Sequence, residues 1–115
     1  MKQIQDYYAP LVGEFELLVL MSLLRLGGGA YGATIRREIQ DRTQRDVAIG
    51  TVYMTLKRLE EKGLIVSYVG NPSRHRGGRR RRHYVMHELG QHALGRAYRT
   101  FKAMAEGFQK ELEDF

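Results

Sequence analysis

A chain of 115 residues is enough for one domain with an appended element, and its hydrophobic core is small enough that a second subunit would add stability. The 19 Lys and Arg residues against 13 Asp and Glu give a formal net charge of +6, which favours polyanionic partners. The absence of cysteine excludes disulfides and thiolate metal sites. No segment has the pattern of a signal peptide or a membrane span, so we expect a soluble cytoplasmic protein that does not bind membranes.

The first 29 residues separate into an arm, a helix and a turn. Residues 1–13 carry little hydrophobic pattern and contain a proline, so any helix there is expected to be short. Residues 14–26 are apolar around most of a helical circumference, which predicts a helix buried on several sides. The three glycines at 27–29 are expected to end this helix.

Two further helices are predicted before the basic segment. Residues 31–42 place Ile35 and Ile39 one turn apart, with Arg36 and Arg37 directed away from them. Residues 48–63 divide into two opposite faces when they are set at about 100° per residue. The inward face is Val52, Leu56, Leu59 and Gly63. The outward face is Gly50, Met54, Lys57, Arg58 and Glu61, with Tyr53 at its flank. The glycine at position 63 is expected to end the helix in a left-handed conformation.

Two short β-rich segments follow. Residues 64–69 and 81–86 are predicted strands, and the Gly, Asn, Pro and Ser residues between them predict a long loop. Three helices followed by a β-hairpin make the winged form of the helix-turn-helix. The predicted fold class is therefore mainly α with a β-hairpin wing, followed by a long C-terminal helix.

The last predicted helix, residues 88–115, has the most regular pattern in the chain. Its apolar residues alternate in steps of four and three: Leu94, Tyr98, Phe101, Ala105, Phe108, Leu112 and Phe115. A period of 3.5 residues over three heptads is typical of a helix packed lengthwise on another helix. Packing within its own domain is the alternative, but we expect dimerisation across a two-fold axis. The expected division is a DNA-binding domain with its arm at 1–87 and a dimerisation helix at 88–115.

The positive charge is concentrated in the predicted hairpin loop. Between Lys62 and Glu88 there is no acidic residue, and there are six arginines: Arg74, Arg76, Arg79, Arg80, Arg81 and Arg82. A solvated surface is the simplest interpretation of a charge run. The exclusive use of arginine on a glycine-rich hairpin instead favours contact with phosphates or the minor groove. Lys57 and Arg58 on the third helix are positioned for phosphates or a guanine edge, or for pairing with nearby glutamates.

At this point the sequence resembles the PadR-like transcriptional regulators, in particular the short class with a single C-terminal helix. The resemblance covers nearly the whole chain from Gly13. Its anchors are LLVLMSLL at 17–24, Tyr31-Gly32, GTVY at 50–53, LKRLEEKGLI at 56–65, GGRR at 77–80 and ELG at 88–90. Two positions depart from the family pattern. Ala48 stands where a capping side chain usually precedes the third helix, and His87 replaces the usual threonine before the last helix.

The resemblance implies a homodimer that binds a pseudo-palindromic operator in double-stranded DNA, usually as a repressor, and releases it on binding a small, often aromatic or cationic molecule. Gly50, Thr51 and Tyr53 would then face the DNA at the start of the recognition helix. The full expected DNA-binding set is Gly50, Thr51, Tyr53, Met54, Lys57, Arg58, Arg74, Arg76, Arg79 and Arg80. The positions that match the family's effector site are Val12, Phe15, Tyr98 and Phe101.

Other classes of function have little support. Four histidines, His75, His83, His87 and His92, lack an accompanying carboxylate cluster, so no metal site and no cofactor are expected. No nucleophile–base pair or phosphate-binding glycine motif is present, and we expect no enzymatic activity. Two alternatives stay open beside a sequence-specific regulator. One is a non-specific architectural DNA-binding protein that depends on its arginine wing, and the other is an adaptor whose wing binds an acidic protein.

Overall fold

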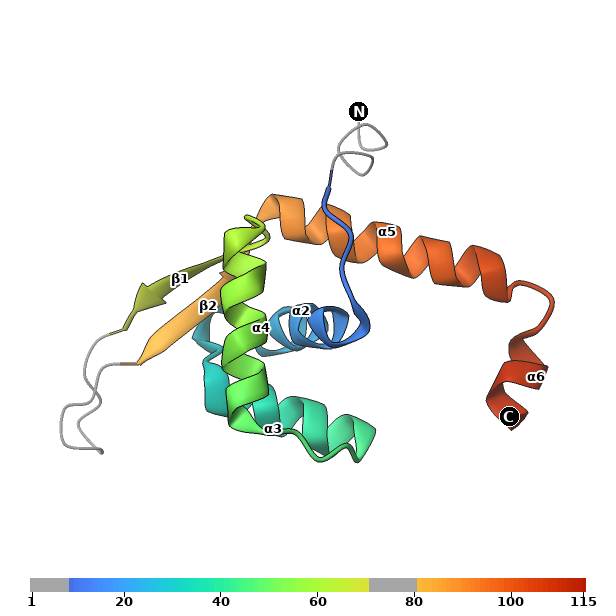
Figure 1. Ribbon diagram of the computed structural model, residues 1–115, viewed down its shortest axis with the longest axis horizontal. Helices are drawn as coiled ribbons and strands as arrows, with labels where there is room; N and C mark the ends of the chain where they lie inside the picture. Colours follow the sequence, from blue (N-terminus) through green and yellow to red (C-terminus); the bar gives the residue numbers. More distant parts are fainter. Residues whose placement is uncertain (1–8, 71–80) are drawn as a thin grey trace.

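The computed structural model describes residues 9–70 and 81–115 (Figure 1). Its elements in chain order are α2 (Glu14–Leu26), the 3-10 turn η1 (Gly27–Gly29), α3 (Gly32–Thr43), α4 (Ile49–Glu61), β1 (Ile65–Val69), β2 (Arg82–Met86), α5 (Glu88–Ala105) and α6 (Gln109–Asp114). The mainly helical fold with a two-stranded hairpin confirms the predicted fold class. The first three helices and both strands lie within two residues of their predicted bounds.

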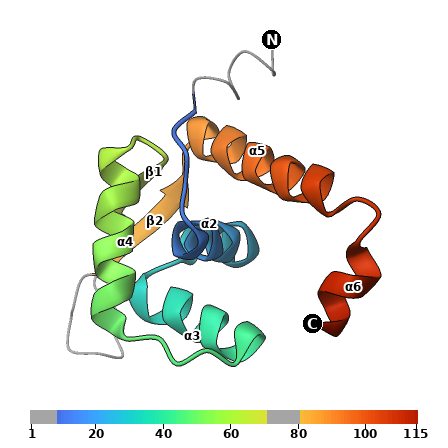
Figure 2. The same cartoon turned by 45° about the vertical axis from the view of Figure 1, so that its right-hand side comes forward.

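Helix α2 lies at the centre of the molecule, with α3, α4, α5 and the hairpin arranged around it (Figure 2). This position explains why its sequence is apolar on several sides. The largest fully buried side chains come from these packed elements: Val19, Leu20, Ile35, Val52, Thr55, Leu56, Leu59, Leu64 and Ile65. Each buried Leu, Ile or Val contributes about 1.5–3 kcal/mol through the apolar surface removed from water.

The hairpin is anchored to the turn that follows α2. Strands β1 and β2 are antiparallel, with Ser67 opposite Tyr84. The amide of Tyr84 donates to the Ala30 carbonyl at 2.9 Å. The hydroxyl of Tyr68 donates to the Gly28 carbonyl at 2.5 Å. These bonds fix the root of the wing on the three-helix body.

The start of α5 is held close to the start of β1. A Cβ atom added at Gly90 would lie 2.2 Å from the carbonyl oxygen of Leu64, so only glycine permits this approach. His87 caps the helix, since its Nδ1 accepts a hydrogen bond from the Leu89 amide at 3.0 Å. The histidine that replaces the family's threonine therefore still serves as an N-cap.

The prediction of one continuous helix over 88–115 is wrong. Helix α5 ends at Ala105, Glu106 adopts an extended conformation, and Gly107 has φ +89° before α6 begins at Gln109. Glycine in a helix interior costs about 1 kcal/mol relative to alanine and accepts the left-handed conformation that breaks the helix here. The 3.5-residue spacing continues through the break, which is why periodicity alone did not reveal it. In Figure 1, α6 stands away from the helical body at the far end of α5.

Candidate nucleic-acid interface

Helices α3 and α4 form a helix-turn-helix whose connecting turn is stabilised by side-chain hydrogen bonds. Gln44 ends α3 in the left-handed conformation at φ 58°. The Gln40 side-chain oxygen accepts from the Val47 amide at 3.1 Å, and Arg36 Nε donates to the Val47 carbonyl at 2.6 Å. Arg36, which we predicted to point outward, is thus half-buried and braces the turn, whereas Arg37 is exposed.

Helix α4 presents the predicted outward face to solvent. Gly50, Thr51, Tyr53, Met54, Lys57 and Arg58 are all exposed. On the opposite side the buried residues are Val52, Thr55, Leu56 and Leu59. As expected, Ala48 provides no side-chain cap, and Gly63 follows the helix at φ +76°. The face predicted to contact DNA is therefore unobstructed by the described part of the chain.

Tyr53 lies against the first turn of α3. A Cβ atom at Gly32 would be 2.6 Å from Cζ and 2.7 Å from the hydroxyl oxygen of Tyr53. Glycine at position 32 therefore makes room for the ring, which explains why the Tyr31-Gly32 pair accompanies the GTVY segment. The side of the ring away from Gly32 remains accessible, since the residue is 50% exposed.

The arginine wing is only partly described. Arg81 places its guanidinium 4.2 Å from the centroid of the Tyr31 ring, a cation–π contact at the loop end of the two strands. Arg82 Nη1 donates to Ser67 Oγ at 2.9 Å, and that hydroxyl donates to a Glu60 carboxylate oxygen at 2.9 Å. The predicted DNA contacts Arg74, Arg76, Arg79 and Arg80 lie outside the described residues.

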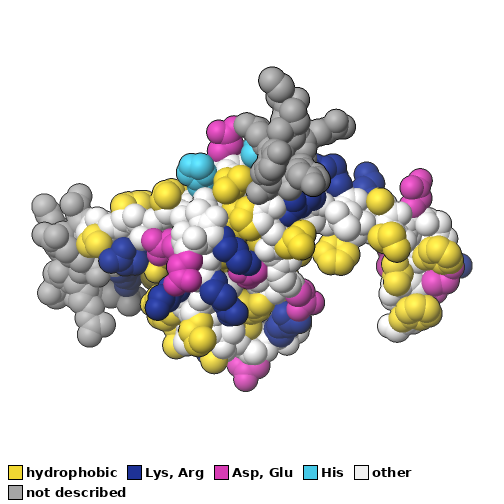
Figure 3. Space-filling view, turned by 45° about the horizontal axis from the view of Figure 1, so that its top comes forward, with side chains coloured by type: hydrophobic (Ala, Val, Ile, Leu, Met, Phe, Trp, Pro, Cys, Tyr) yellow, Lys and Arg dark blue, Asp and Glu magenta, His cyan; other side chains and the backbone are white. Residues whose placement is uncertain are grey.

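Charge on the helical body is mixed. On the face drawn in Figure 3, Lys and Arg side chains over the body lie among Asp and Glu side chains rather than forming an unbroken basic patch. The net charge of the chain equals the charge of the six arginines between Lys62 and Glu88. Strong non-specific attraction to phosphates is therefore expected from the wing rather than from the helices.

The far end of α4 is fixed by an ion pair that sequence analysis missed. Lys62 Nζ lies 2.8 Å from both carboxylate oxygens of Glu16 and 3.1 Å from the Leu11 carbonyl oxygen. The Gly13 amide donates to the same carboxylate at 2.8 Å. Burial raises the pKa of Glu16, but the hydrogen bonds from Lys62 and Gly13 and the positive charges of Lys62 and Arg58 outweigh burial and lower the pKa below 4.5. The sequence signal for this contact is an acidic residue, Glu16, within an apolar helix. It lies three residues after Gly13, which precedes the helix.

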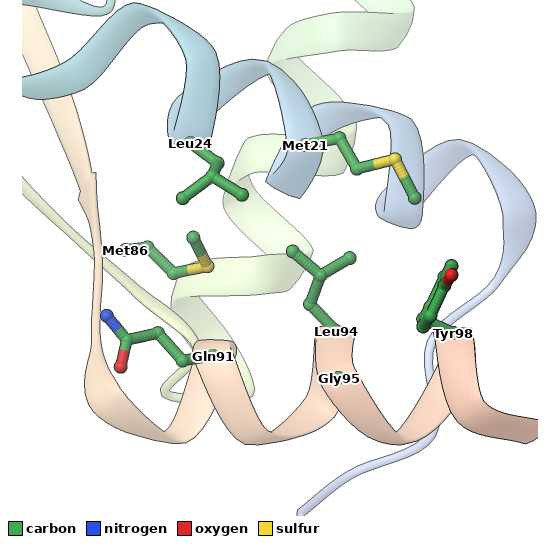
Figure 4. Close-up of a pocket in the computed structure, with 7 residues that line it drawn as sticks. All are labelled: Met21, Leu24, Met86, Gln91, Leu94, Gly95 and Tyr98. Carbon is green, nitrogen blue, oxygen red and sulfur yellow. The ribbon is translucent and has the colours of Figure 1, made fainter.

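The four positions expected to hold an effector do not all line one groove. Tyr98 lines an apolar groove of about 440 Å³ between α2, β2 and α5 (Figure 4). The groove is lined by Met21, Leu24, Met86, Gln91, Leu94, Gly95 and Tyr98. Val12 and Phe101 line a second groove of about 130 Å³ between the arm and α5. Phe15 packs against the hydrophobic core instead. Sequence analysis missed Met21 and Leu24 of α2 and Met86 of β2, because only the fold brings these elements against α5.

The predicted dimerisation residues leave an apolar surface on the single chain. Tyr98, Phe101, Phe108 and Leu112 are each more than half exposed, while Leu94 and Ala105 are half-buried. Large apolar side chains grouped on one part of a protein surface commonly mark an interface. After the break at Gly107, the apolar residues of α5 and α6 lie on two separate helices rather than on one straight stripe.

Within residues 9–70 and 81–115, no group of three or more His, Cys, Asp or Glu side chains is placed to hold a metal ion. His75 lies outside these ranges. None of the described helices combines the length and the hydrophobicity that crossing a membrane requires.

A three-helix body with an antiparallel hairpin and an exposed second helix in its helix-turn-helix defines the winged-helix class of DNA-binding proteins. The sequence matches the Transcriptional regulator PadR-like family over residues 19–96, more than half of its length. The chain belongs to this family of transcriptional regulators, which implies regulation through DNA binding and is not a class of enzymes. No curated protein matches the sequence.

Solved structures agree with this assignment. A PadR family transcription regulator from Clostridium difficile is 28% identical, with a TM-score of 0.72, and the match covers 87% of this chain and 99% of that one. A PadR family transcriptional regulator from Eggerthella lenta is 26% identical, with a TM-score of 0.66 and coverage of 87% of each chain. A transcriptional regulator from Clostridium thermocellum shares the fold at 22% identity, with a TM-score of 0.66 and coverage of 96% and 97%.

Proposed function

We propose that this protein is a cytoplasmic, homodimeric repressor that binds a pseudo-palindromic DNA operator and is released by a small-molecule effector. The observation that carries the proposal is the outward face of α4, which is exposed on a helix-turn-helix whose turn is braced by Arg36. In such proteins the second helix enters the major groove and its N-terminal residues contact base edges. The DNA-binding unit would be residues 1–87, with residues 88–115 forming the dimer.

Two kinds of DNA contact are proposed. On α4, Gly50, Thr51, Tyr53, Met54, Lys57 and Arg58 would provide recognition of the operator sequence. On the wing, Arg74, Arg76, Arg79 and Arg80 would bind phosphates and supply affinity that depends strongly on salt.

Dimerisation would bury the exposed apolar side chains of the C-terminal helices. The proposed contacts are Leu94, Tyr98, Phe101 and Ala105 on α5, Phe108 in the break that follows, and Leu112 on α6. A two-fold dimer would place two recognition helices in successive major grooves, about 10 base pairs apart. Half-sites with this spacing are therefore expected in the operator.

The effector would be apolar or aromatic, because the groove that contains Tyr98 is lined almost entirely by apolar side chains. Val12 and Phe101 are proposed to contribute from the arm side of α5, where they line the second groove. Phe15 is the fourth proposed effector contact, and it is partly buried against the hydrophobic core. Binding that changes how α5 sits against the arm or the partner would change the separation of the recognition helices.

The experiment that tests sequence recognition by α4 and phosphate binding by the wing compares Tyr53→Ala with Arg80→Ala. Operator and random duplexes are titrated with each variant over a range of salt concentrations. Tyr53→Ala is expected to reduce the preference for the operator, and Arg80→Ala to lower the salt dependence of binding to both duplexes. The reverse pattern would overturn the assignment.

The six arginines of the wing favour one alternative, a non-specific architectural DNA-binding protein. That alternative predicts nearly equal affinity for all duplexes and no effect of Tyr53→Ala on sequence preference. An adaptor that binds an acidic protein would instead fail to bind duplex DNA even at low salt.

A further inference from the structure

The N-terminal half of α4 offers DNA bases only two exposed hydrogen-bonding side chains, the hydroxyls of Thr51 and Tyr53. The exposed residues before Lys57 are Ile49, Gly50, Thr51, Tyr53 and Met54. The amide and guanidinium groups that commonly pair with adenine and guanine in the major groove are absent from this half of the helix. If this half enters the groove as the proposed function requires, recognition there depends mainly on apolar contact.

Tyr53 is directed to the side of this surface rather than to its centre. Its ring and hydroxyl lie within 2.7 Å of where a Cβ of Gly32 would be, at the first turn of α3. The aromatic ring therefore belongs to the junction of α3 and α4. Met54, which is 66% exposed, is the most exposed large apolar residue on this half of the helix.

Gly50 lies one helical turn before Met54, and the fold does not require glycine there. A Cβ atom at this position would meet nothing within 4 Å, and the residue does not have a positive φ. Alanine would be more favourable in a helix by about 1 kcal/mol. A glycine that the protein's own packing does not explain is consistent with close approach of another molecule to the backbone. No side chain projects from the helix at Gly50, and the flexible thioether of Met54 lies one turn further along the same face.

We propose that Met54, assisted by the methyl group of Thr51, recognises the C5-methyl group of thymine, while Gly50 lets the helix approach the base edges closely. The thymine methyl is the apolar group that a base pair presents in the major groove. Thr51 lies three residues before Met54 and is also exposed, so both apolar groups share one face of the helix. The inference rests on the proposed function and specifies the base that the recognition helix prefers.

The test uses the DNA sequence that the full-length protein enriches from a random pool. Each thymine of that duplex is replaced in turn by uracil, which removes only the C5-methyl group, and the Kd is measured for the wild type and for Met54→Ala. Burial of one methyl corresponds to about a fourfold change in affinity, so symmetric replacement in both half-sites is expected to weaken wild-type binding by about 15-fold. Met54→Ala is expected to lose most of this sensitivity to uracil.

Met104→Ala is the matched control, because Met104 is also an exposed methionine but lies on α5. It should keep the wild-type response to uracil, even if its overall affinity changes. Gly50→Ala provides an independent readout: it should raise the thermal midpoint of the protein while weakening operator binding. A variant that binds the operator as well as the wild type would overturn the proposed close approach.

The outcomes separate this inference from the function on which it rests. Enrichment of a specific site without any uracil effect, or with an equal effect in Met54→Ala, overturns thymine recognition but leaves the operator-binding function standing. Recovery of an unenriched pool overturns the sequence-specific function itself.

Discussion

Removing the positive charge of Lys62 should destabilise the protein through the buried carboxylate it leaves behind. Methionine at position 62 keeps an unbranched apolar side chain but loses the contacts of Nζ with both Glu16 oxygens at 2.8 Å and with the Leu11 carbonyl oxygen at 3.1 Å. Glu16 is only 8% exposed, and its hydrogen bond from the Gly13 amide remains. A hydrogen bond to a charged group contributes about 1.5–3 kcal/mol, and the carboxylate cannot be fully rehydrated.

The expected loss for Lys62→Met is about 2 kcal/mol, near the lower end of that range, because the lysine side chain is 32% exposed and water screens it. For a chain of this size the loss corresponds to a Tm lower by about 8 °C. Thermal unfolding followed by circular dichroism measures it, at one fixed protein concentration because a dimer's Tm depends on concentration.

Two further variants make this prediction specific. Lys110→Met removes an exposed lysine on α6 and should change stability by less than about 0.5 kcal/mol. The double variant Glu16→Gln with Lys62→Met should recover much of the loss, since no uncompensated carboxylate stays buried. A single variant as stable as the wild type would refute the reasoning, as would a double variant no more stable than the single one.

Three other predictions concern the fold and its pH dependence. Gly90→Ala should lower the free energy of unfolding, measured in urea, by about 3 kcal/mol, because its Cβ would lie 2.2 Å from the Leu64 carbonyl oxygen. An unchanged urea midpoint would show that the backbone can shift to accept the methyl group. Tyr68→Phe should lose about 1 kcal/mol with the hydrogen bond to Gly28, and a loss of zero would mean that water replaces the bond. The lowered pKa of Glu16 means that its carboxylate stabilises the fold above about pH 4.5 and that this contribution is lost as pH falls through the lowered value. The stability difference between wild type and Glu16→Gln should therefore be constant at neutral pH and shrink only in acid, whereas a difference that grows in acid would contradict the sign.

The sequence was informative wherever one helix face packs on a continuous core. The alternation of Val52, Leu56 and Leu59 with exposed residues predicted both the orientation of α4 and its outward surface, because burial on one side imposes a 3.6-residue period. The two strands of the hairpin were predicted equally well, since β-branched and aromatic residues are local signals.

The remaining features depend on contacts between distant segments. The role of Arg36 in bracing the turn and the pairing of Glu16 with Lys62 follow from tertiary packing, which periodicity does not encode. Tyr98 lines one groove, and Val12 and Phe101 line the other, because one side of α5 lies against α2 and another side lies against the arm. The break at Gly107 was missed because a heptad pattern records spacing and not backbone conformation.

Selection of bound duplexes from a random-sequence pool at physiological salt tests the central claim most directly. The account predicts enrichment of a two-fold symmetric site with half-sites about 10 base pairs apart, as required by two recognition helices related by dimer symmetry. Recovery of an unenriched pool would contradict it and would assign DNA binding to the arginine wing alone.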